Sequence, residues 1–374
     1  MHIAIVTGGY GGYSGVHTHV RDLSGQLSQH NHIVTIFAPD VKDEDSAEGI
    51  CFRKINDVRF VPQLLFYFFR LIRRHKEKKI DVVHVFDSIA FLSAYLFRAI
   101  YKTPIIFTFQ ASIFSKGRQI DYSWLMIVIL KFTNRFAARH ADKVIVVSKE
   151  MLECARYAGA KERRLILIHN PIDLAKFYSL RDKKRHQLNQ KICLYVGALR
   201  PVKGVQYLLE AIPEVLQNTP DTFFMIVGDG PLKGELEQLS SKLNITDSIS
   251  FRGNLKREDL LEYYNLAEVF IIPSINEPQG IVVLEALACG CPVIGTNVGG
   301  IPEMVKNGEN GILVPPRDYI NLGRAIIRLL SDEKLFKDYS INAINTAKEF
   351  SWINNLHKFT NLYEEISNDR ELRR

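Results

Sequence analysis

The sequence has no apolar run long enough to cross a membrane and no cysteine pattern typical of disulfide bonds. Its five cysteines are odd in number and form neither a CxxC pair nor a zinc-type spacing with histidine. Cys289 and Cys291 stand in an apolar run, where cysteine acts as a small core residue. The longest apolar run, residues 124–130, is well short of the roughly 18 residues of a membrane span. The opening MHIAIVTGG is too short and too uncharged for a secretory signal, so we expect a cytoplasmic protein or one bound to a membrane surface from that side.

Length and charge predict two domains of different character. The chain has 374 residues, of which 47% are hydrophobic, and a net charge of +7. Residues 1–190 carry 29 Lys and Arg against 17 Asp and Glu, whereas the remainder carries 19 against 24. The polar stretch 181–191 between them is typical of a linker. We predict an N-terminal domain over 1–185, a second domain over 186–350, and a C-terminal helix over 351–374 that packs back across them.

Short apolar runs alternate with helical patterns in both halves. The runs are nearly continuous rather than alternating, which is typical of parallel strands covered on both faces. The fold class is therefore α/β, with two doubly wound parallel-sheet domains in series and a helical C-terminal tail. The predicted strands are 2–7, 33–38, 81–86, 104–109, 143–148, 165–169, 192–197, 223–228, 248–253, 269–274 and 291–296.

The glycine-rich stretch GGYGGYSG, residues 8–15, follows the first predicted strand. It precedes a helix expected from Val16, whose N-terminus favours an anion, so it is a candidate phosphate cradle. It is not a dinucleotide fingerprint, because Ser14 stands in place of the third glycine, and no lysine follows as in a P-loop. A dehydrogenase is therefore disfavoured. A flexible turn that needs positive φ remains the alternative.

The stretch NEPQGIVVLEALACGCPV, residues 276–293, carries two glutamates, Glu277 and Glu285, eight residues apart. Pro278 and Gly280 make one helix through both unlikely, so we place Glu277 on a loop and Glu285 on the helix that begins near Gly280. Glu285 is flanked by apolar residues, where a charge is costly without a partner. It could face water on an amphipathic helix, or accept hydrogen bonds from a polyhydroxylated ligand.

EPQGIVVLE resembles the E-x7-E motif of the retaining, nucleotide-sugar-dependent glycosyltransferases of family four. The resemblance extends over nearly the whole chain, and it implies the GT-B fold of two facing Rossmann-like domains. The further segments that carry it, in chain order, are SGVHTHVRDL, DVVHVF, VIVVS, HNPIDLAKF, YVGALRPVKG, IVGDGPL, FRGNL, PSINEPQGIVVLEALACGCPVIGTNVGGIPEMV and NGILVPP.

The resemblance implies a role for each matching residue. Glu277 would bind hydroxyls of the donor sugar, Glu285 would hold the nucleotide ribose, and Lys203 would contact the diphosphate. Carboxylates suit hydroxyls, and a cation with backbone donors suits the charge that develops on a leaving diphosphate. Gly12 of the glycine-rich stretch and further residues of the matching segments are expected to bind the donor, namely Gly15, Gly197, Gly230, Arg252, Gln279, Gly280 and Ile281.

The chain departs from the family pattern at three places. Ala198 stands where the family often has arginine, and Arg200 could reach the phosphates instead. Gln110 stands where the family has a histidine near the acceptor and donor sugar; it can form hydrogen bonds but cannot carry a proton at neutral pH. Ser14 replaces the first loop glycine. We assign Glu277, Lys203, Arg200 and Gln110 to the catalytic centre.

The implied reaction is retaining transfer of a hexosyl group from a UDP-, GDP- or ADP-sugar to a hydroxyl. The leaving phosphate would take the acceptor's proton, in keeping with the lack of a nucleophile elbow. The DxD at residues 43–45 lies in a charged run and is better explained as solvated, so no metal and no cofactor beyond the nucleotide sugar are expected. A non-catalytic sugar-nucleotide-binding protein and a nucleotide-sugar epimerase on the same fold remain alternatives.

The basic half suggests the kind of acceptor. Residues 52–79 interleave nine Lys and Arg with aromatic and aliphatic residues, and residues 115–140 repeat the pattern. Basic amphipathic helices of this kind are typical of anionic membrane surfaces, which would suit a lipid-linked sugar or another glycan acceptor. The apolar face could equally be the domain core. No nucleic-acid-binding module accompanies the charge, so no nucleic-acid partner is expected.

Overall fold

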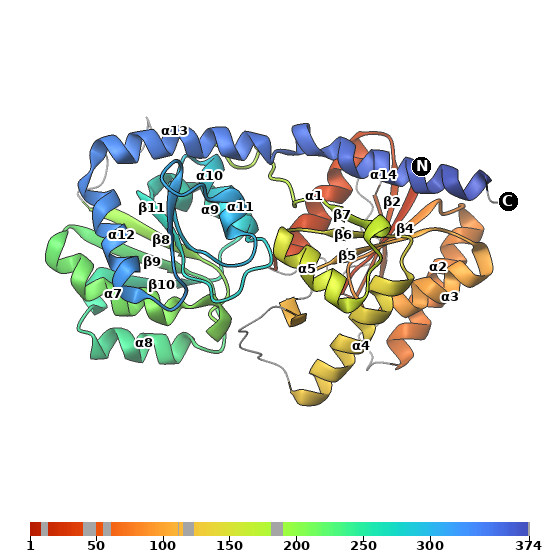
Figure 1. The fold of residues 1–374 in the computed structure, drawn as a ribbon, viewed down its shortest axis with the longest axis horizontal. Coiled ribbons are helices and arrows are strands. Elements are labelled where there is room, and N and C mark those ends of the chain that lie inside the picture. The colour runs from red at the N-terminus through yellow and green to blue at the C-terminus, as the bar shows by residue number, and fades with distance from the viewer. Residues whose placement is uncertain are drawn as a thin grey trace. The chain divides into compact units, whose positions relative to one another are not determined.

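The computed structural model describes residues 1–8, 14–39, 50–54, 61–110, 112–114, 123–180 and 190–372. These residues form two compact units (Figure 1). Those of unit 1 lie within Met1–Ser115, Tyr122–Asn170 and Asn355–Arg374, and those of unit 2 lie within Pro171–Asn354. The boundary predicted after residue 185 falls among residues 181–189, outside the described residues, and stays a prediction.

Unit 1 is a parallel seven-stranded sheet with the strand order β3-β2-β1-β4-β5-β6-β7. Its strands are β1 (His2–Val6), β2 (Ile33–Ala38), β3 (Ile50–Lys54), β4 (Val82–Val85), β5 (Ile105–Phe109), β6 (Lys143–Val146) and β7 (Leu165–Leu167). Its helices are α1 (Gly15–Gln29), α2 (Val61–Glu77), α3 (Phe91–Tyr101), α4 (Trp124–His140), α5 (Lys149–Ala158) and most of α14 (Trp352–Leu372), with short 3-10 turns η1 (Ser112–Phe114) and η2 (Glu162–Arg164).

Unit 2 is a parallel six-stranded sheet with the order β10-β9-β8-β11-β12-β13. Its strands are β8 (Lys191–Val196), β9 (Thr222–Val227), β10 (Ile249–Gly253), β11 (Val269–Ile272), β12 (Val293–Thr296) and β13 (Gly311–Val314). Its helices are α7 (Val205–Asn218), α8 (Lys233–Lys242), α9 (Arg257–Leu266), α10 (Ile281–Ala288), α11 (Ile301–Met304), α12 (Tyr319–Ser331) and α13 (Glu333–Glu349), with 3-10 turns η4 (Pro201–Lys203) and η5 (Thr246–Ser248).

The predicted α/β fold is confirmed, and the apolar runs explain it. Along β8 successive side chains enter different cores: Cys193 and Tyr195 join one apolar cluster, and Leu194 and Val196 join another. A strand covered on both faces needs apolar residues at every position, which is why these runs do not alternate. Cys289 and Cys291 are fully buried in the second cluster, as expected of small core residues.

The strand order reverses at one place in each sheet, beside β1 in unit 1 and beside β8 in unit 2. In unit 2 the chain runs from β8 outward through β9 to β10, and then returns to the other side of β8 as β11. The loops that follow β8 and β11 therefore leave neighbouring strands at the same carboxyl edge of the sheet. Such a switch point is where open α/β sheets bind ligands.

The C-terminal tail is helical, as predicted. The Asp332 carboxylate accepts a hydrogen bond from the amide of Leu335 at the start of α13, and the Ser351 hydroxyl accepts one from the amide of Asn354 at the start of α14. Further along α14, the hydroxyl of Tyr363 lies 2.8 Å from Nδ1 of His84 on β4. Burial lowers the pKa of His84, so this helix packs on unit 1 through a neutral histidine.

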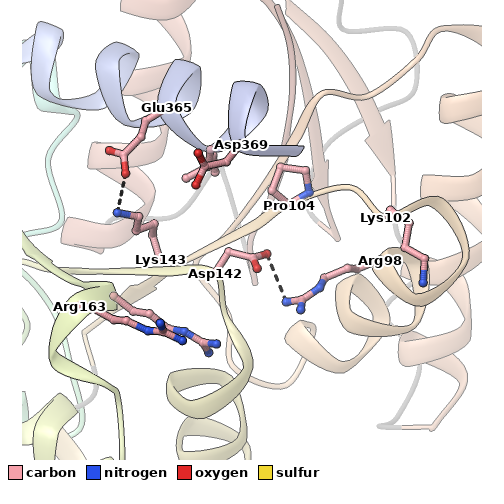
Figure 2. Close-up of a pocket in the computed structure, with 10 residues that line it drawn as sticks. Arg98, Lys102, Pro104, Asp142, Lys143, Arg163, Glu365 and Asp369 are labelled. Atoms are coloured by element: carbon pink, nitrogen blue, oxygen red, sulfur yellow. Dashed lines mark hydrogen bonds and ion pairs between the residues drawn. The ribbon is translucent and has the colours of Figure 1, made fainter. Parts of the chain in front are cut away.

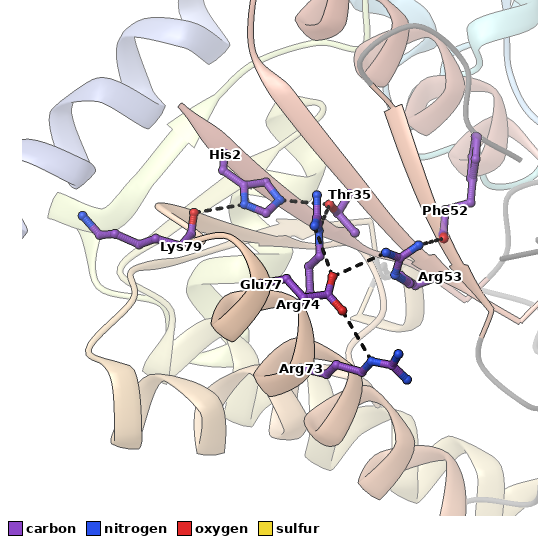
Figure 3. Close-up of polar contacts among 8 residues, drawn as sticks. All are labelled: His2, Thr35, Phe52, Arg53, Arg73, Arg74, Glu77 and Lys79. Carbon is purple, nitrogen blue, oxygen red and sulfur yellow. Dashed lines mark hydrogen bonds and ion pairs between the residues drawn. The ribbon is translucent and has the colours of Figure 1, made fainter. Parts of the chain in front are cut away.

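The end of α2 is fixed to the sheet by a polar cluster (Figure 3). Glu77 forms ion pairs with Arg53 at 3.5 Å, with Arg73 at 3.4 Å and with Arg74 at 3.3 Å. Burial by itself would raise the pKa of Glu77. The hydrogen bond and charge of Arg74, together with the charge of Arg53, outweigh that effect, so the pKa of Glu77 is lowered. Arg74 also donates to the hydroxyl of Thr35 on β2. Part of the positive charge of residues 52–79 is therefore neutralised within the fold.

Candidate active site

A buried glutamate and a lysine meet at the switch point of unit 2. Glu277 lies on the loop between β11 and α10, where the sequence predicts it, and is only 7% exposed. Its Oε2 accepts a hydrogen bond of 2.6 Å from Nζ of Lys203, which ends η4 after β8. The hydroxyl of Ser274 lies 3.4 Å from the same oxygen. Because β8 and β11 are neighbours in the sheet, their following loops bring the two predicted residues together.

Glycine allows the loops around Glu277 to pack main chain against main chain. Gly299 has a φ of +57°, and a Cβ there would lie 1.6 Å from the carbonyl oxygen of Glu277. The amide of Gly300 donates to that same oxygen at 3.0 Å. Gly204 has a φ of +66°, and a Cβ there would lie 2.0 Å from the carbonyl oxygen of Pro273. Only glycine fits at these two positions, because φ is positive at both and because a Cβ would overlap a carbonyl oxygen.

Helix α10 starts directly after Glu277. Gly280 precedes it with a φ of +88°, and Gln279 and Ile281 are 2% and 7% exposed. The first turn of a helix has amides without intrahelical acceptors, and its dipole is positive there. The start of α10 therefore offers hydrogen-bond donors to an anion beside the carboxylate of Glu277.

Glu285 lies inside α10 and is only 2% exposed, so the alternative in which it faces water is wrong. Its Oε1 accepts a hydrogen bond of 3.0 Å from Nε of Arg257, and its Oε2 accepts one of 3.0 Å from the hydroxyl of Tyr264. Arg257 also lies over the ring of Phe177, 5.1 Å from its centre. Burial, reinforced by the charge of Glu285, raises the pKa of Tyr264, which keeps this hydroxyl protonated as a donor.

Arg257 and Tyr264 are partners that the sequence analysis did not identify. They stand seven residues apart on α9, two helical turns, and so share one face of that helix. The sequence predicts that a carboxylate at Glu285 needs a partner, but many cations of the chain could serve. The seven-residue spacing of arginine and tyrosine in REDLLEYY is the one local signal that could have pointed to them.

The glycine turns after β8 and β9 pack tightly against one another. A Cβ on Gly228 would lie 1.9 Å from the carbonyl oxygen of Gly197, and one on Gly230 would lie 2.5 Å from that of Leu199. The predicted cations nearby are both exposed: Arg200 precedes η4, and Nε of Arg252 donates to the hydroxyl of Ser250. Gly197, Gly230, Arg200 and Arg252 thus stand at the carboxyl ends of neighbouring strands, while their donor-binding roles stay predictions.

Unit 1 holds the remaining predicted residues. Gln110 follows β5, and its amide nitrogen Nε2 is buried without a hydrogen-bond partner among the described residues. Gly15 begins α1, and the hydroxyl of Ser14 caps that helix by accepting from the amide of His17. The cap explains serine at this position. Gly12 and the DxD at 43–45 lie outside the described residues.

Asp87 is a further acidic residue at the carboxyl edge of unit 1 that the sequence analysis missed. It follows β4, and burial raises the pKa of its carboxyl although the amides of Ile89 and Ala90 oppose the shift. A Cβ on Gly8, after β1, would lie 2.7 Å from Oδ2 of Asp87. The signal available in the sequence is an acidic residue directly after a predicted strand, 81–86.

Comparisons with known proteins agree with this fold. The family model described as glycosyltransferase family 4 matches residues 13–176, and the one described as glycosyl transferases group 1 matches residues 177–346. The solved structure of sucrose-phosphate synthase from Thermosynechococcus elongatus matches 98% of this chain and 99% of that chain, with a TM-score of 0.87 and 24% identity. The structure of Anabaena HepE in complex with UDP and glucose matches 97% of this chain and 99% of that chain, with a TM-score of 0.81 and 19% identity.

Two relatives illustrate the range of the sequence matches. An uncharacterized glycosyltransferase of Methanocaldococcus jannaschii is 27% identical over 97% of this chain and 98% of its own length. D-inositol 3-phosphate glycosyltransferase of Streptomyces bingchenggensis is 33% identical over 57% of this chain, which spans half the length of that relative. Two doubly wound parallel-sheet units in one chain define the GT-B class of fold. The chain belongs to the glycosyltransferases, with a family 4 domain followed by a group 1 domain.

Proposed function

We propose that the protein transfers a hexosyl group, with retention, from a nucleoside diphosphate sugar to a hydroxyl acceptor. The observation that carries the proposal is the pair formed by Lys203 and Glu277, 2.6 Å apart beside the start of α10. A cation and free helix amides suit a diphosphate, and a carboxylate suits sugar hydroxyls. Solved structures with this fold include HepE in complex with UDP-glucose, which supports a nucleotide-sugar donor, whether UDP-, GDP- or ADP-linked.

The proposed reaction needs no protein nucleophile. The bond from the sugar's anomeric carbon to the diphosphate breaks, and a bond from the acceptor oxygen to the same face of that carbon forms. The leaving phosphate oxygen takes the acceptor's proton, so atoms and charge balance. Lys203 and the amides at the start of α10 stabilise the charge that develops on the diphosphate. We propose that no metal ion takes part.

Glu285 can hold the nucleotide ribose without giving up its protein partners. Arg257 and Tyr264 each donate a hydrogen bond to one of its two oxygens, and a carboxylate oxygen can accept more than one. We propose that the carboxylate also accepts the two ribose hydroxyls. In this arrangement Arg257 and Tyr264 fix the orientation of the carboxylate before the nucleotide arrives, which lowers the entropic cost of binding.

A thermal-shift screen against UDP-, GDP- and ADP-glucose tests the donor site. One of the three is expected to raise the melting temperature, since a ligand at about 100 times its Kd stabilises the folded state by about 2.7 kcal/mol. Lys203→Met should weaken that shift, whereas Lys334→Met, an exposed lysine on α13, should preserve it. Absence of a shift with all three sugars would sink the proposal.

Product analysis separates transfer from the alternatives. With a sugar-labelled donor and a panel of hydroxyl acceptors, a glycosyltransferase yields a labelled glycoside, in the presence of EDTA as well. A labelled sugar whose configuration is changed at one carbon, without a glycoside, indicates an epimerase. Binding with neither transfer nor slow hydrolysis indicates a non-catalytic sugar-nucleotide-binding protein.

An exposed apolar surface on unit 1 bears on the acceptor. Helix α4 begins WLMIVIL, yet none of its residues 124–133 is buried, and Trp124 and Phe132 are 75% and 69% exposed. Helix α3 contacts both α2 and α4, and Phe69 on α2 and Ile100 on α3 are 61% and 57% exposed. The domain core therefore accounts for only part of the apolar residues in 52–79 and 115–140. We define the α2–α4 surface by the exposed apolar residues Leu65, Phe66, Phe69, Leu92, Leu96, Ile100, Trp124, Leu125, Val128 and Phe132.

We propose that the α2–α4 surface binds the cytoplasmic face of an anionic membrane, where the acceptor is a lipid-linked sugar or another glycan. Helices α2, α3 and α4 carry eight Lys and Arg against a single Glu, Glu77, which suits anionic headgroups around an apolar contact. None of the helices in the described part of the chain is long and apolar enough to cross a bilayer. Attachment from one side would fit such a chain.

Vesicle flotation tests this surface. The protein is expected to float with vesicles that contain phosphatidylglycerol and to bind less to pure phosphatidylcholine or at high salt, because screening weakens the electrostatic part. The double variant Trp124→Ser/Phe132→Ser should lose most of the binding, whereas Ile353→Ser, at an 87% exposed position outside the surface, should not. No flotation at low salt, or self-association through this surface by light scattering, would contradict the proposal.

A further inference from the structure

A cavity lies in unit 1, at the amino edge of its sheet, opposite to the carboxyl edge of the same sheet. It has a volume of about 640 Å³ and lies between the end of α3, the amino ends of β5 and β6, η2 and α14 (Figure 2). Pro104 and Asp142 line it, each directly before the first residue of a strand. Loops that follow parallel strands gather at the carboxyl edge, so this cavity shares no residue with the donor site.

The cavity is lined with more cations than carboxylates. Five cations line it, namely Arg98, Lys102, Lys143, Arg163 and Arg164, against the three carboxylates of Asp142, Glu365 and Asp369. Two cations are paired there: Arg98 with Asp142 at 3.2 Å and Lys143 with Glu365 at 2.7 Å. The side chains of Lys102 and Arg163 have no hydrogen-bond or ion-pair partner among the described residues, and both residues are exposed. The cavity thus has cationic groups left for an anion.

A neighbouring histidine reports the same positive potential. His140 ends α4, and its carbonyl oxygen accepts a hydrogen bond of 2.8 Å from Arg98. Partial burial lowers the pKa of His140, and the charges of Arg164, Arg98 and Arg139 lower it further. Cations that disfavour a protonated imidazole favour a bound anion for the same electrostatic reason.

The carboxylates define which kind of anion fits. Glu365 and Asp369 stand four residues apart on α14 and both line the cavity, with Arg163 of η2 on one side of the view and Arg98 and Lys102 on the other (Figure 2). Carboxylates accept hydrogen bonds from hydroxyl groups but repel a bare polyanion. A molecule with a phosphate at one end and hydroxyls at the other satisfies both sides of the cavity. A nucleic acid, with phosphate along its whole length, does not.

We propose that this cavity binds a small hydroxylated phosphate ester, such as a sugar phosphate or the headgroup of a phosphorylated lipid. The phosphate contacts Arg163, and the hydroxyls donate to Glu365 and Asp369, while Lys102 on the other side of the cavity adds to its positive charge. Occupancy then adds a bridge between α14 and the body of unit 1, beside the Lys143–Glu365 pair. Since α14 begins at Trp352 with unit 2 and continues into unit 1, the ligand acts on the helix that the two units share.

Calorimetric titration with glucose 6-phosphate, inorganic phosphate and glucose tests the cavity. Glucose 6-phosphate is expected to bind more tightly than inorganic phosphate, and glucose not measurably. The double variant Lys102→Glu/Arg163→Glu should raise the Kd by about tenfold or more, because it replaces the charge-assisted contact of Arg163 with repulsion and reverses the charge of Lys102 as well. Lys334→Glu, an exposed lysine of unit 2, is the matched control and should leave the Kd unchanged. Because Lys102 and Arg163 are exposed, the variant should fold, as circular dichroism checks.

Two further arms separate the possible ligands and roles. Asp369→Asn should weaken the binding of glucose 6-phosphate but not that of inorganic phosphate, since the change alters only the part of the cavity that accepts hydrogen bonds from the sugar hydroxyls. The Trp124→Ser/Phe132→Ser variant lacks the proposed membrane contact of the α2–α4 surface. If it still floats with vesicles that contain phosphatidylinositol 4-phosphate, the cavity binds a lipid headgroup. If it does not float, the ligand is a free sugar phosphate. The proposal would be overturned if neither glucose 6-phosphate nor the phosphatidylinositol 4-phosphate vesicles bind, or if the Lys102→Glu/Arg163→Glu variant binds them as well as the unchanged protein does. Neither result depends on transfer activity, so the proposed function stands or falls separately.

Discussion

Replacing Glu277 with alanine is expected to lower sugar transfer by at least about a hundredfold, while the affinity for the free nucleoside diphosphate stays the same or improves. Glu277 is only 7% exposed, and its carboxylate accepts a hydrogen bond of 2.6 Å from Lys203. In our proposal it holds the donor sugar, so its loss affects the transition state around the sugar. Lys203 loses a competing anion and becomes freer to contact the diphosphate.

Initial rates with the donor identified by thermal shift, and calorimetry with the matching nucleoside diphosphate, measure the two effects. Glu277→Gln keeps the shape of the side chain and should retain part of the activity, because an amide oxygen still accepts from a hydroxyl. Glu309→Ala, at an exposed position of unit 2, is the control and should behave as the unchanged protein. A Glu277→Ala enzyme with full activity would show that this carboxylate does not touch the reacting sugar.

Replacing Glu285 with alanine is expected to destabilise unit 2 by about 3–5 kcal/mol, since it leaves the guanidinium of Arg257 without its carboxylate. Glu285 is 2% exposed, and the Arg257 side chain is 13% exposed in this ion pair. Tyr264 also loses the acceptor of its buried hydroxyl. Thermal unfolding should show a lower midpoint for unit 2, and the double variant Glu285→Ala/Arg257→Met should be less destabilised than the two single changes added together.

Nucleotide binding separates the structural role of Glu285 from its proposed role at the ribose. Glu285→Gln should weaken the binding of UDP, or of the nucleoside diphosphate whose base the thermal-shift screen selects. It should leave the affinity for inorganic pyrophosphate unchanged. Arg257→Met keeps the carboxylate and should weaken the nucleotide less than Glu285→Gln does. Equal loss of pyrophosphate and nucleotide affinity would mean that the glutamate acts only through the fold.

The fold was predictable where the apolar runs were long and uninterrupted. Strands β2 and β1 coincide with predicted runs to within a residue, because parallel strands covered on both faces leave no position for a polar residue. The two strands that the sequence analysis missed lie at sheet edges. β3 contains Arg53 and Lys54, and β13 has only the four residues Gly311–Val314. An edge strand pairs on one side only, so it tolerates charge and brevity.

The site was predictable as residue types and loops, and less so as partners. Pro278 and Gly280 correctly separate Glu277 on a loop from Glu285 on a helix. The contact between Lys203 and Glu277 depends on the pairing of β8 with β11, which lie about 75 residues apart in the chain. Arg257 shows the limit more clearly: many cations could have paired with Glu285, and nothing local selects this one.

The sequence by itself determined the two parallel-sheet units, the helical tail, the burial of Cys289 and Cys291, and the loop and helix positions of the two glutamates. Each of these follows from local periodicity or from the backbone limits of proline and glycine. The tertiary structure alone decided which charges meet, namely Lys203 with Glu277 and Arg257 with Glu285, and which apolar residues of α4 stay exposed. Those outcomes depend on strand order and helix packing, which bring together residues that no sequence window contains.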